Sequence, residues 1–254
     1  MTPIQLRAAP LFSMFLTLAL GALGSAPLPA AETSLSADIA LVSDYRFRGV
    51  SQTDRHPAVQ GGWTLSGDSG FSIGVWASNV DFAADDGSAS TSMELDFVLG
   101  YSGAFGDSDG AGWSVSYAQY SYPGYDELNY PEVIIDLAFG DLAVQLVHSD
   151  DYFATGEPAL VGILGYTFAL GERLSLGMSY GSVNTEARLF GETDDLTSAE
   201  FTDSHSFYSI ELGAQWREDG ARLSLGWHGT NVDDMHCTGN ICEGAWVAGI
   251  SQSF

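Results

Sequence analysis

The chain of 254 residues carries 33 acidic residues, eight arginines and no lysine, a formal net charge of −25. This excess of negative charge argues against a nucleic-acid partner, because binding to phosphates requires patches of cations. The 30 glycines, the 12% of aromatic residues and a mean hydropathy near zero are compatible with one large all-β domain.

The first 31 residues are predicted to be a cleaved signal peptide. Arg7 precedes an apolar run at 11–23, and small residues and prolines follow up to Ala31, which is the order of a secretory signal. A transmembrane anchor is the alternative, but the run is shorter than the roughly 20 residues that a spanning helix needs. We therefore expect export, with residues 32–254 forming a single domain.

Beyond residue 34, the chain contains about twelve segments in which apolar and polar residues alternate. A period of two is typical of strands with one apolar and one polar face. Their lengths cluster near the roughly 9 to 11 residues of a tilted membrane strand. The segments are 35–48, 58–66, 70–80, 92–104, 112–122, 132–139, 142–149, 159–170, 174–182, 206–217, 221–230 and 244–254.

The connections between these segments alternate in length. Those after even-numbered segments are short, such as 67–69, 140–141, 171–173 and 218–220, whereas those after odd-numbered segments are long, such as 81–91, 123–131 and 183–205. This layout predicts an antiparallel transmembrane β-barrel of about twelve strands, with short periplasmic turns and long extracellular loops. Gram-negative outer membranes contain such barrels, and tryptophans and tyrosines at the ends of the apolar faces agree with an interfacial girdle.

The stretch 43–53 places Asp44, Arg46 and Arg48 on the polar face of the first segment. In a barrel these side chains would face the lumen near the outer rim, while Tyr45 and Phe47 would meet lipid. One interpretation is a selectivity element that contacts solutes. The other is a structural ion-pair network with acidic residues predicted to face inward, since unpaired charges in a narrow lumen are costly. Those acidic residues are Glu94, Asp96 and Asp136.

Cys237 and Cys242 are five residues apart, a spacing that predicts a disulfide at a loop tip in an oxidising compartment. A metal site that includes His236 is the alternative, but structural zinc sites use more ligands. No other metal site and no cofactor is predicted. Acidic residues in the long loops predict a negative field that attracts cations; they are Asp81, 85–86, 126–127, 150–151, 194–195 and 233–234.

Several short motifs resemble those of the TorF-type family of bacterial porins. They are the sequences at 43–49, 51–53, 57–61, 74–82, 94–96, 122–124 and 149–153. The resemblance covers essentially the mature chain and is most specific in its first third. It implies an outer-membrane barrel with a passive pore, and it supplies no catalytic residues. The loop 183–205 and the Cys237 and Cys242 pair fall outside this pattern.

The predicted function is a porin-like channel for passive diffusion of small hydrophilic solutes, with a preference for cations. The expected partners are outer-membrane lipid, lipopolysaccharide, the outer-membrane insertion machinery through the terminal Phe254, and further copies of the chain. A structural or adhesive barrel with a closed lumen is an alternative, because twelve strands lie between filled and open barrels in size.

A lipid hydrolase is the less favoured alternative. His148, His205 and His228 lie near serines in the sequence. Adjacent residues of a strand point to opposite faces, so His148 and Ser149 cannot act on each other. We therefore expect a protein that is not an enzyme.

Overall fold

A computed structural model describes residues 33–84, 87–106, 110–187, 204–216, 220–232, 237 and 240–254. The predicted signal peptide lies outside this part of the chain, as do His236 and the acidic pairs at 85–86, 194–195 and 233–234. Within the described residues, no helix is both long and apolar enough to cross a membrane.

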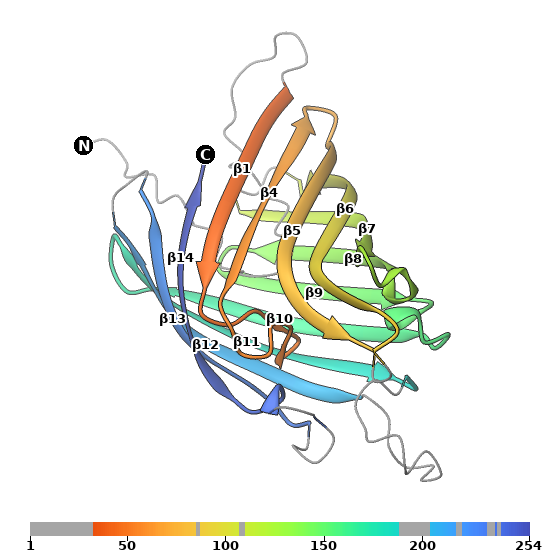
Figure 1. The fold of residues 1–254 in the computed structure, drawn as a ribbon. Helices are drawn as coiled ribbons and strands as arrows, with labels where there is room; N and C mark the ends of the chain where they lie inside the picture. Colours follow the sequence, from red (N-terminus) through yellow and green to blue (C-terminus); the bar gives the residue numbers. More distant parts are fainter. Residues whose placement is uncertain are drawn as a thin grey trace, which may run out of the picture.

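Twelve strands form one closed antiparallel barrel, as the alternating segments predict (Figure 1). Neighbours in the sequence pair with each other, and β1 pairs with β14 to close the wall, for example Leu41 with Ile250. The barrel strands are β1 (Thr33–Val42), β4 (Ala58–Gly67), β5 (Phe71–Ala83), β6 (Ser90–Ala104), β7 (Ala111–Ser121), β8 (Tyr130–Phe139), β9 (Leu142–Ser149), β10 (Ala159–Ala169), β11 (Leu174–Thr185), β12 (His205–Gln215), β13 (Arg222–Thr230) and β14 (Ala245–Ser253).

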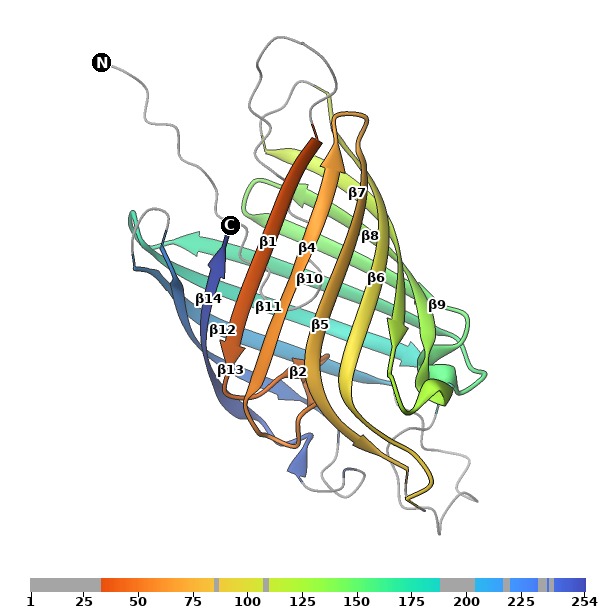
Figure 2. The same cartoon turned by 45° about the horizontal axis from the view of Figure 1, so that its top comes forward.

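The two ends of the barrel differ. The turn end carries the short connections and the C-terminal end of β14, and the loop end carries the long connections (Figure 2). Two short 3-10 helices lie in long connections, η1 (Asp126–Leu128) and η2 (Tyr152–Ala154).

The outer wall of the barrel is apolar on every strand, because alternate residues of a strand point to opposite faces. A contiguous apolar surface of this extent is far larger than soluble monomers expose and fits a lipid environment. At the turn end, aromatic rings meet on the outside, with centroids of Phe71 and Tyr101 4.7 Å apart. The exposed apolar residues include Leu41, Val59, Ile73, Phe97, Tyr117, Ile135, Leu146, Leu164, Met178, Ile210, Leu225 and Ile250.

The first predicted strand is too long by six residues. β1 ends at Val42, and the chain then turns into the barrel and forms a small hairpin of β2 (Arg46–Phe47) and β3 (Val50–Ser51). The expectation that Tyr45 and Phe47 meet lipid is therefore wrong, since their exposed fractions are 0% and 6%. The alternating pattern continues through the hairpin, but both kinds of side chain lie inside the protein. Tyr45 and Phe47 pack against aromatic rings, and the polar residues that alternate with them form ion pairs.

Candidate functional site

The lumen has two parts with different side chains. Toward the turn end, its wall carries small polar residues that are partly exposed, among them Ser36, Thr64, Ser175, Ser224 and Ser251. At the loop end, inward-facing residues are buried on strands around the whole wall. Those buried residues include Val42, Ala58, Val80, Glu94, Tyr120, Glu132, Val147, Val161, Val183, Phe207 and Val247. The lumen is therefore filled at the loop end.

The filling segment is the stretch 43–53, which we call the lumen hairpin. Its turn consists of Arg48 and Gly49, with φ values of 49° and 88°, between the paired residues Phe47 and Val50. Positive φ at both central residues characterises the two-residue type I′ turn, which matches the twist of a hairpin. Gly49 lies against the wall, where an added Cβ would be 2.8 Å from Thr230 Cβ of β13.

Arg48 at the tip of the lumen hairpin forms a buried ion pair with Glu132 of β8. Its Nη2 donates to both carboxylate oxygens at 2.8 and 2.9 Å, and Tyr120 OH donates to the same carboxylate at 3.0 Å. The guanidinium also lies 4.4 Å from the ring centroid of Phe47 and 5.3 Å from that of Tyr152. The tip is thereby fastened to the wall by charge and by cation–π contacts.

The pKa of Arg48 reflects this surrounding. Burial is the largest single influence and lowers the pKa, but the Glu132 carboxylate and the neighbouring Tyr152, Tyr130 and Tyr120 together raise it more, so the net shift is upward. The side chain therefore stays charged at any physiological pH. Just before β2 of the hairpin, burial first and then Glu94 and Asp96 raise the pKa of Tyr45. Its phenol consequently remains protonated and can donate a hydrogen bond.

Arg46 fastens the hairpin to the opposite side of the barrel. Its Nε donates to Asp44 at 2.6 Å, and its Nη1 donates to the carbonyl oxygens of Ile241 at 3.1 Å and Glu243 at 2.7 Å. Ser51 donates through its hydroxyl to Asp44 at 2.6 Å and through its backbone N–H to Ile241 at 2.9 Å. The hairpin therefore spans the lumen between β8 and the loop that precedes β14.

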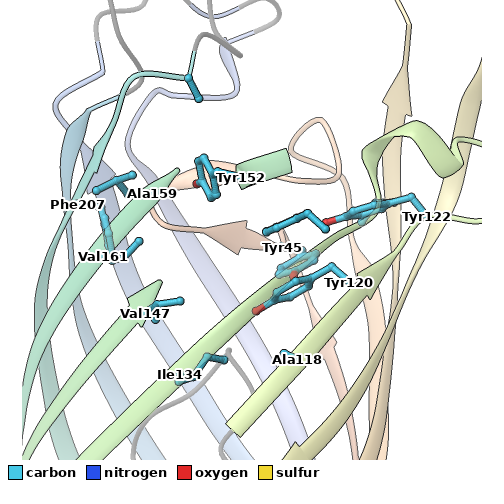
Figure 3. Close-up of a cluster of buried hydrophobic side chains, with 14 of the residues drawn as sticks. Tyr45, Ala118, Tyr120, Tyr122, Ile134, Val147, Tyr152, Ala159, Val161 and Phe207 are labelled. Atoms are coloured by element: carbon cyan, nitrogen blue, oxygen red, sulfur yellow. The ribbon is translucent and has the colours of Figure 1, made fainter. Parts of the chain in front are cut away.

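Aromatic rings pack around the hairpin, and Figure 3 shows those of Tyr45, Tyr120, Tyr122 and Tyr152. Tyr45 lies 5.6 Å from Trp76 of β5, between ring centroids. Phe47 lies 6.3 Å from Tyr120 of β7 and 5.9 Å from Phe153 in η2. The loop with η2 thus packs against the hairpin. Buried aromatic pairs of this kind contribute beyond their buried area.

The comparisons with known proteins give a family and a fold. A model of a bacterial protein family of unknown function, Gcw_chp, matches residues 26–254. The chain belongs to the Gcw_chp family. No curated protein matches the chain.

Solved structures similar to the Gcw_chp barrel are outer-membrane channels. A KdgM porin has a TM-score of 0.51 and 12% identity, with 86% of this chain and 99% of that chain covered. The KdgM porin in complex with disordered oligogalacturonate gives the same values. An outer membrane channel from Pseudomonas putida F1 has a TM-score of 0.44 and 13% identity, with 90% and 97% covered. At these identities the likeness shows the barrel fold alone. The TorF-type name remains a prediction, because the matched family has no assigned function.

The predicted lumen residues of the Gcw_chp barrel separate into two groups. Asp44, Arg46 and Arg48 lie in the lumen hairpin, and Glu94 and Asp96 lie on the adjacent wall, where Glu94 accepts a hydrogen bond from Tyr122 at 3.1 Å. Asp136 lies farther toward the turn end, where it accepts from Gln145 at 2.8 Å and Ser114 at 3.1 Å.

The expectation that the arginines pair with Glu94, Asp96 and Asp136 is wrong. In the described part of the chain their ion-pair partners are Asp44 and Glu132. The alternating pattern places Glu132 on the inward face of its strand, but it does not show which carboxylate the hairpin tip reaches. That choice depends on how far the hairpin extends across the lumen, which the sequence does not reveal.

Cys237 and Cys242 form a disulfide with their Cα atoms 6.0 Å apart. In the described part of the chain, His148 Nε2 lies 2.8 Å from Asp150 and its Nδ1 lies 3.1 Å from the Ala159 carbonyl. His205 Nε2 lies 3.0 Å from the Arg48 carbonyl. These contacts fix the orientation of the two imidazole rings.

Proposed function

We propose that the protein is an outer-membrane channel through which small hydrophilic solutes diffuse, and that the lumen hairpin controls passage at the extracellular end. The observation that carries this proposal is the division of the lumen. A polar, partly exposed half opens at the turn end, and the closure at the other end consists of a loop segment and not of wall strands. Loops can move without breaking the barrel.

Cation preference is part of the same proposal. Around the loop end, the described charged residues are mostly acidic, and Asp38, Asp136 and Glu211 face the lumen of the polar half, where Arg222 is the opposing charge. A lumen and mouth of one predominant sign raise the local concentration of counter-ions. The same acidic surface supports the proposal that divalent cations and lipopolysaccharide lie at the outer rim.

Single-channel conductance in planar bilayers tests this function. The test compares the wild-type protein with a variant in which residues 45–52 are replaced by a short Gly-Ser linker. We expect brief or small openings for the wild type and long, larger steps for the variant, because its lumen lacks the filling segment. A control variant replaces the exposed Asp126 and Glu127 by Ser-Gly and should behave like the wild type. Circular dichroism confirms that each sample contains folded barrels.

A closed structural barrel is the second candidate function. The buried ion pair of Arg48 and the rings around Tyr45 favour it, because they make the hairpin a well-packed part of the interior. Folded barrels that give no steps with and without the hairpin would support this alternative and exclude the channel.

A further inference from the structure

Three metal-ligating side chains meet at the rim of the loop end. Asp54 and His56 follow the lumen hairpin, and Asp81 lies near the end of β5. One ligand atom from each residue lies within 4.8 Å of the other two, and all three side chains are exposed. Ligands of a tetrahedral zinc ion lie about 3.3 to 3.6 Å apart, given bonds of about 2.0 to 2.2 Å. Small side-chain rotations therefore suffice to bring these atoms onto one ion.

The imidazole of His56 is oriented for metal binding. Its Nδ1 lies 3.2 Å from the carbonyl oxygen of Thr53. A carbonyl oxygen can only accept, so Nδ1 carries the proton in this contact, and in the neutral imidazole the lone pair is then on Nε2. A backbone carbonyl that fixes the tautomer in this way is the usual outer-shell partner of a histidine that binds a metal.

The backbone also holds the two segments of this cluster together. Asp81 lies where the pairing of β5 with β6 shifts register, between Asn79 and Phe82. Such bulges redirect side chains and are common next to functional sites. The Asp81 N–H donates to the carbonyl oxygen of Gln52 at 2.8 Å, so β5 is tied to the last residues of the lumen hairpin.

The nearest cation does not compete for this cluster. Arg55, between Asp54 and His56, donates to Glu243 at 2.7 Å on the loop that precedes β14. The two carboxylates and one imidazole therefore form a negatively charged ligand set with a nitrogen donor. This combination suits Zn²⁺ and similar transition metals better than Ca²⁺, which takes six to eight oxygen ligands.

We propose that Asp54, His56 and Asp81 bind a divalent transition metal ion such as Zn²⁺, with water in the remaining position. The ion joins the segment after the lumen hairpin to β5 at the point where Gln52 already contacts Asp81. Metal binding therefore holds the hairpin in the lumen. This second effect, unlike the metal site itself, rests on the proposed channel function.

Isothermal titration calorimetry of the untagged, refolded full-length protein with ZnCl2 tests the site. We expect one saturable site in the wild type. Loss of an outer-shell partner alone weakens metal binding about 10- to 100-fold, so His56→Ala and Asp81→Asn should each weaken it by more than about 100-fold. Asp54→Asn should also weaken binding, and asparagine tolerates the positive φ of 48° at this position.

His148→Ala is the matched control, because His148 and Asp150 form an exposed pair with a single carboxylate. This variant should bind Zn²⁺ like the wild type. Absence of saturable binding in the wild type, or equal binding by His56→Ala, would overturn the metal site and leave the channel proposal untouched, because calorimetry requires no solute flux.

Conductance tests separately whether the bound metal holds the hairpin in the lumen. Zn²⁺ should reduce the openings of the wild-type channel and leave those of His56→Ala unchanged. Equal responses of the two proteins to Zn²⁺ would show that the metal does not hold the hairpin, even where calorimetry supports the metal site.

Discussion

At the scale of single residues, the buried pair of Arg48 and Glu132 decides where the lumen hairpin lies. The two side chains expose 5% and 1% of their surfaces. Removing two charges from water costs several kcal/mol, and their mutual attraction and hydrogen bonds must offset this cost. The pair is consequently stable only when both members are present, which makes the tip of the hairpin specific for one place on the wall.

Glu132→Gln should lower the free energy of unfolding by about 3 to 5 kcal/mol, because it leaves a buried guanidinium without its counter-charge. Urea unfolding followed by tryptophan fluorescence measures this change. Arg48→Met combined with Glu132→Leu should recover most of the loss. Arg55→Ala, which breaks the exposed pair with Glu243, should cost only about 0 to 1 kcal/mol. Similar losses for Glu132→Gln and Arg55→Ala would contradict the importance of the buried pair.

Gly49 is the second residue on which the docked hairpin depends. A side chain there requires a left-handed backbone at φ 88° and a Cβ only 2.9 Å from that of Phe207. Gly49→Ala should therefore displace the hairpin and increase the open time in bilayers. Gly140→Ala is the control, since Gly140 has φ 61° and no atom within 4 Å of an added Cβ. If Gly49→Ala gates like the wild type, the wall accommodates the added methyl group and the prediction is wrong.

At the scale of elements, the barrel strands were predictable and the hairpin was not. Each strand has its own period of two, because lipid lies on one side and the lumen on the other, and this signal is local. The pattern of Tyr45 and Phe47 is the same although the chain has left the wall after Val42. The two-residue turn at Arg48 and Gly49 was the available signal for the hairpin. Arg48 at this turn binds Glu132, which is 84 residues away in the sequence, and no local pattern indicates a contact over that separation.

The disulfide loop is the element that holds the other side of the hairpin. Cys237 and Cys242 flank the residue Ile241, whose carbonyl accepts from Arg46 and from the backbone of Ser51. The bond restricts this loop, so its removal should weaken those contacts.

Replacing both cysteines by serine should lower the free energy of unfolding by about 2 kcal/mol, the entropic value for such a short loop. It should also raise the frequency of channel openings. Treating the wild type with dithiothreitol should produce the same two changes, while the serine variant should not respond. If the serine variant also responded to dithiothreitol, the reductant would be acting on something other than this disulfide.

At the scale of the whole molecule, the sequence predicted the charge but not how the structure distributes it. Two of the inward-facing cations, Arg46 and Arg48, are buried in ion pairs at the loop end. Asp38 and Asp136 lie in the polar half of the lumen, without an ion pair in the described part of the chain. A passage opened by movement of the hairpin would therefore be lined mainly by negative charge.

The barrel without its hairpin, with residues 45–52 replaced by a Gly-Ser linker, should prefer K⁺ over Cl⁻ in a KCl gradient. The preference should weaken between about 0.1 and 1 M salt, because the screening length falls from about 10 Å to about 3 Å. Asp38→Asn combined with Asp136→Asn should reduce the K⁺ preference further. Asp150→Asn at the outer rim should have a smaller effect on this preference at high salt. The reversal potential measures all four cases. Anion preference at 0.1 M would show that the lumen carboxylates do not set the field along the path.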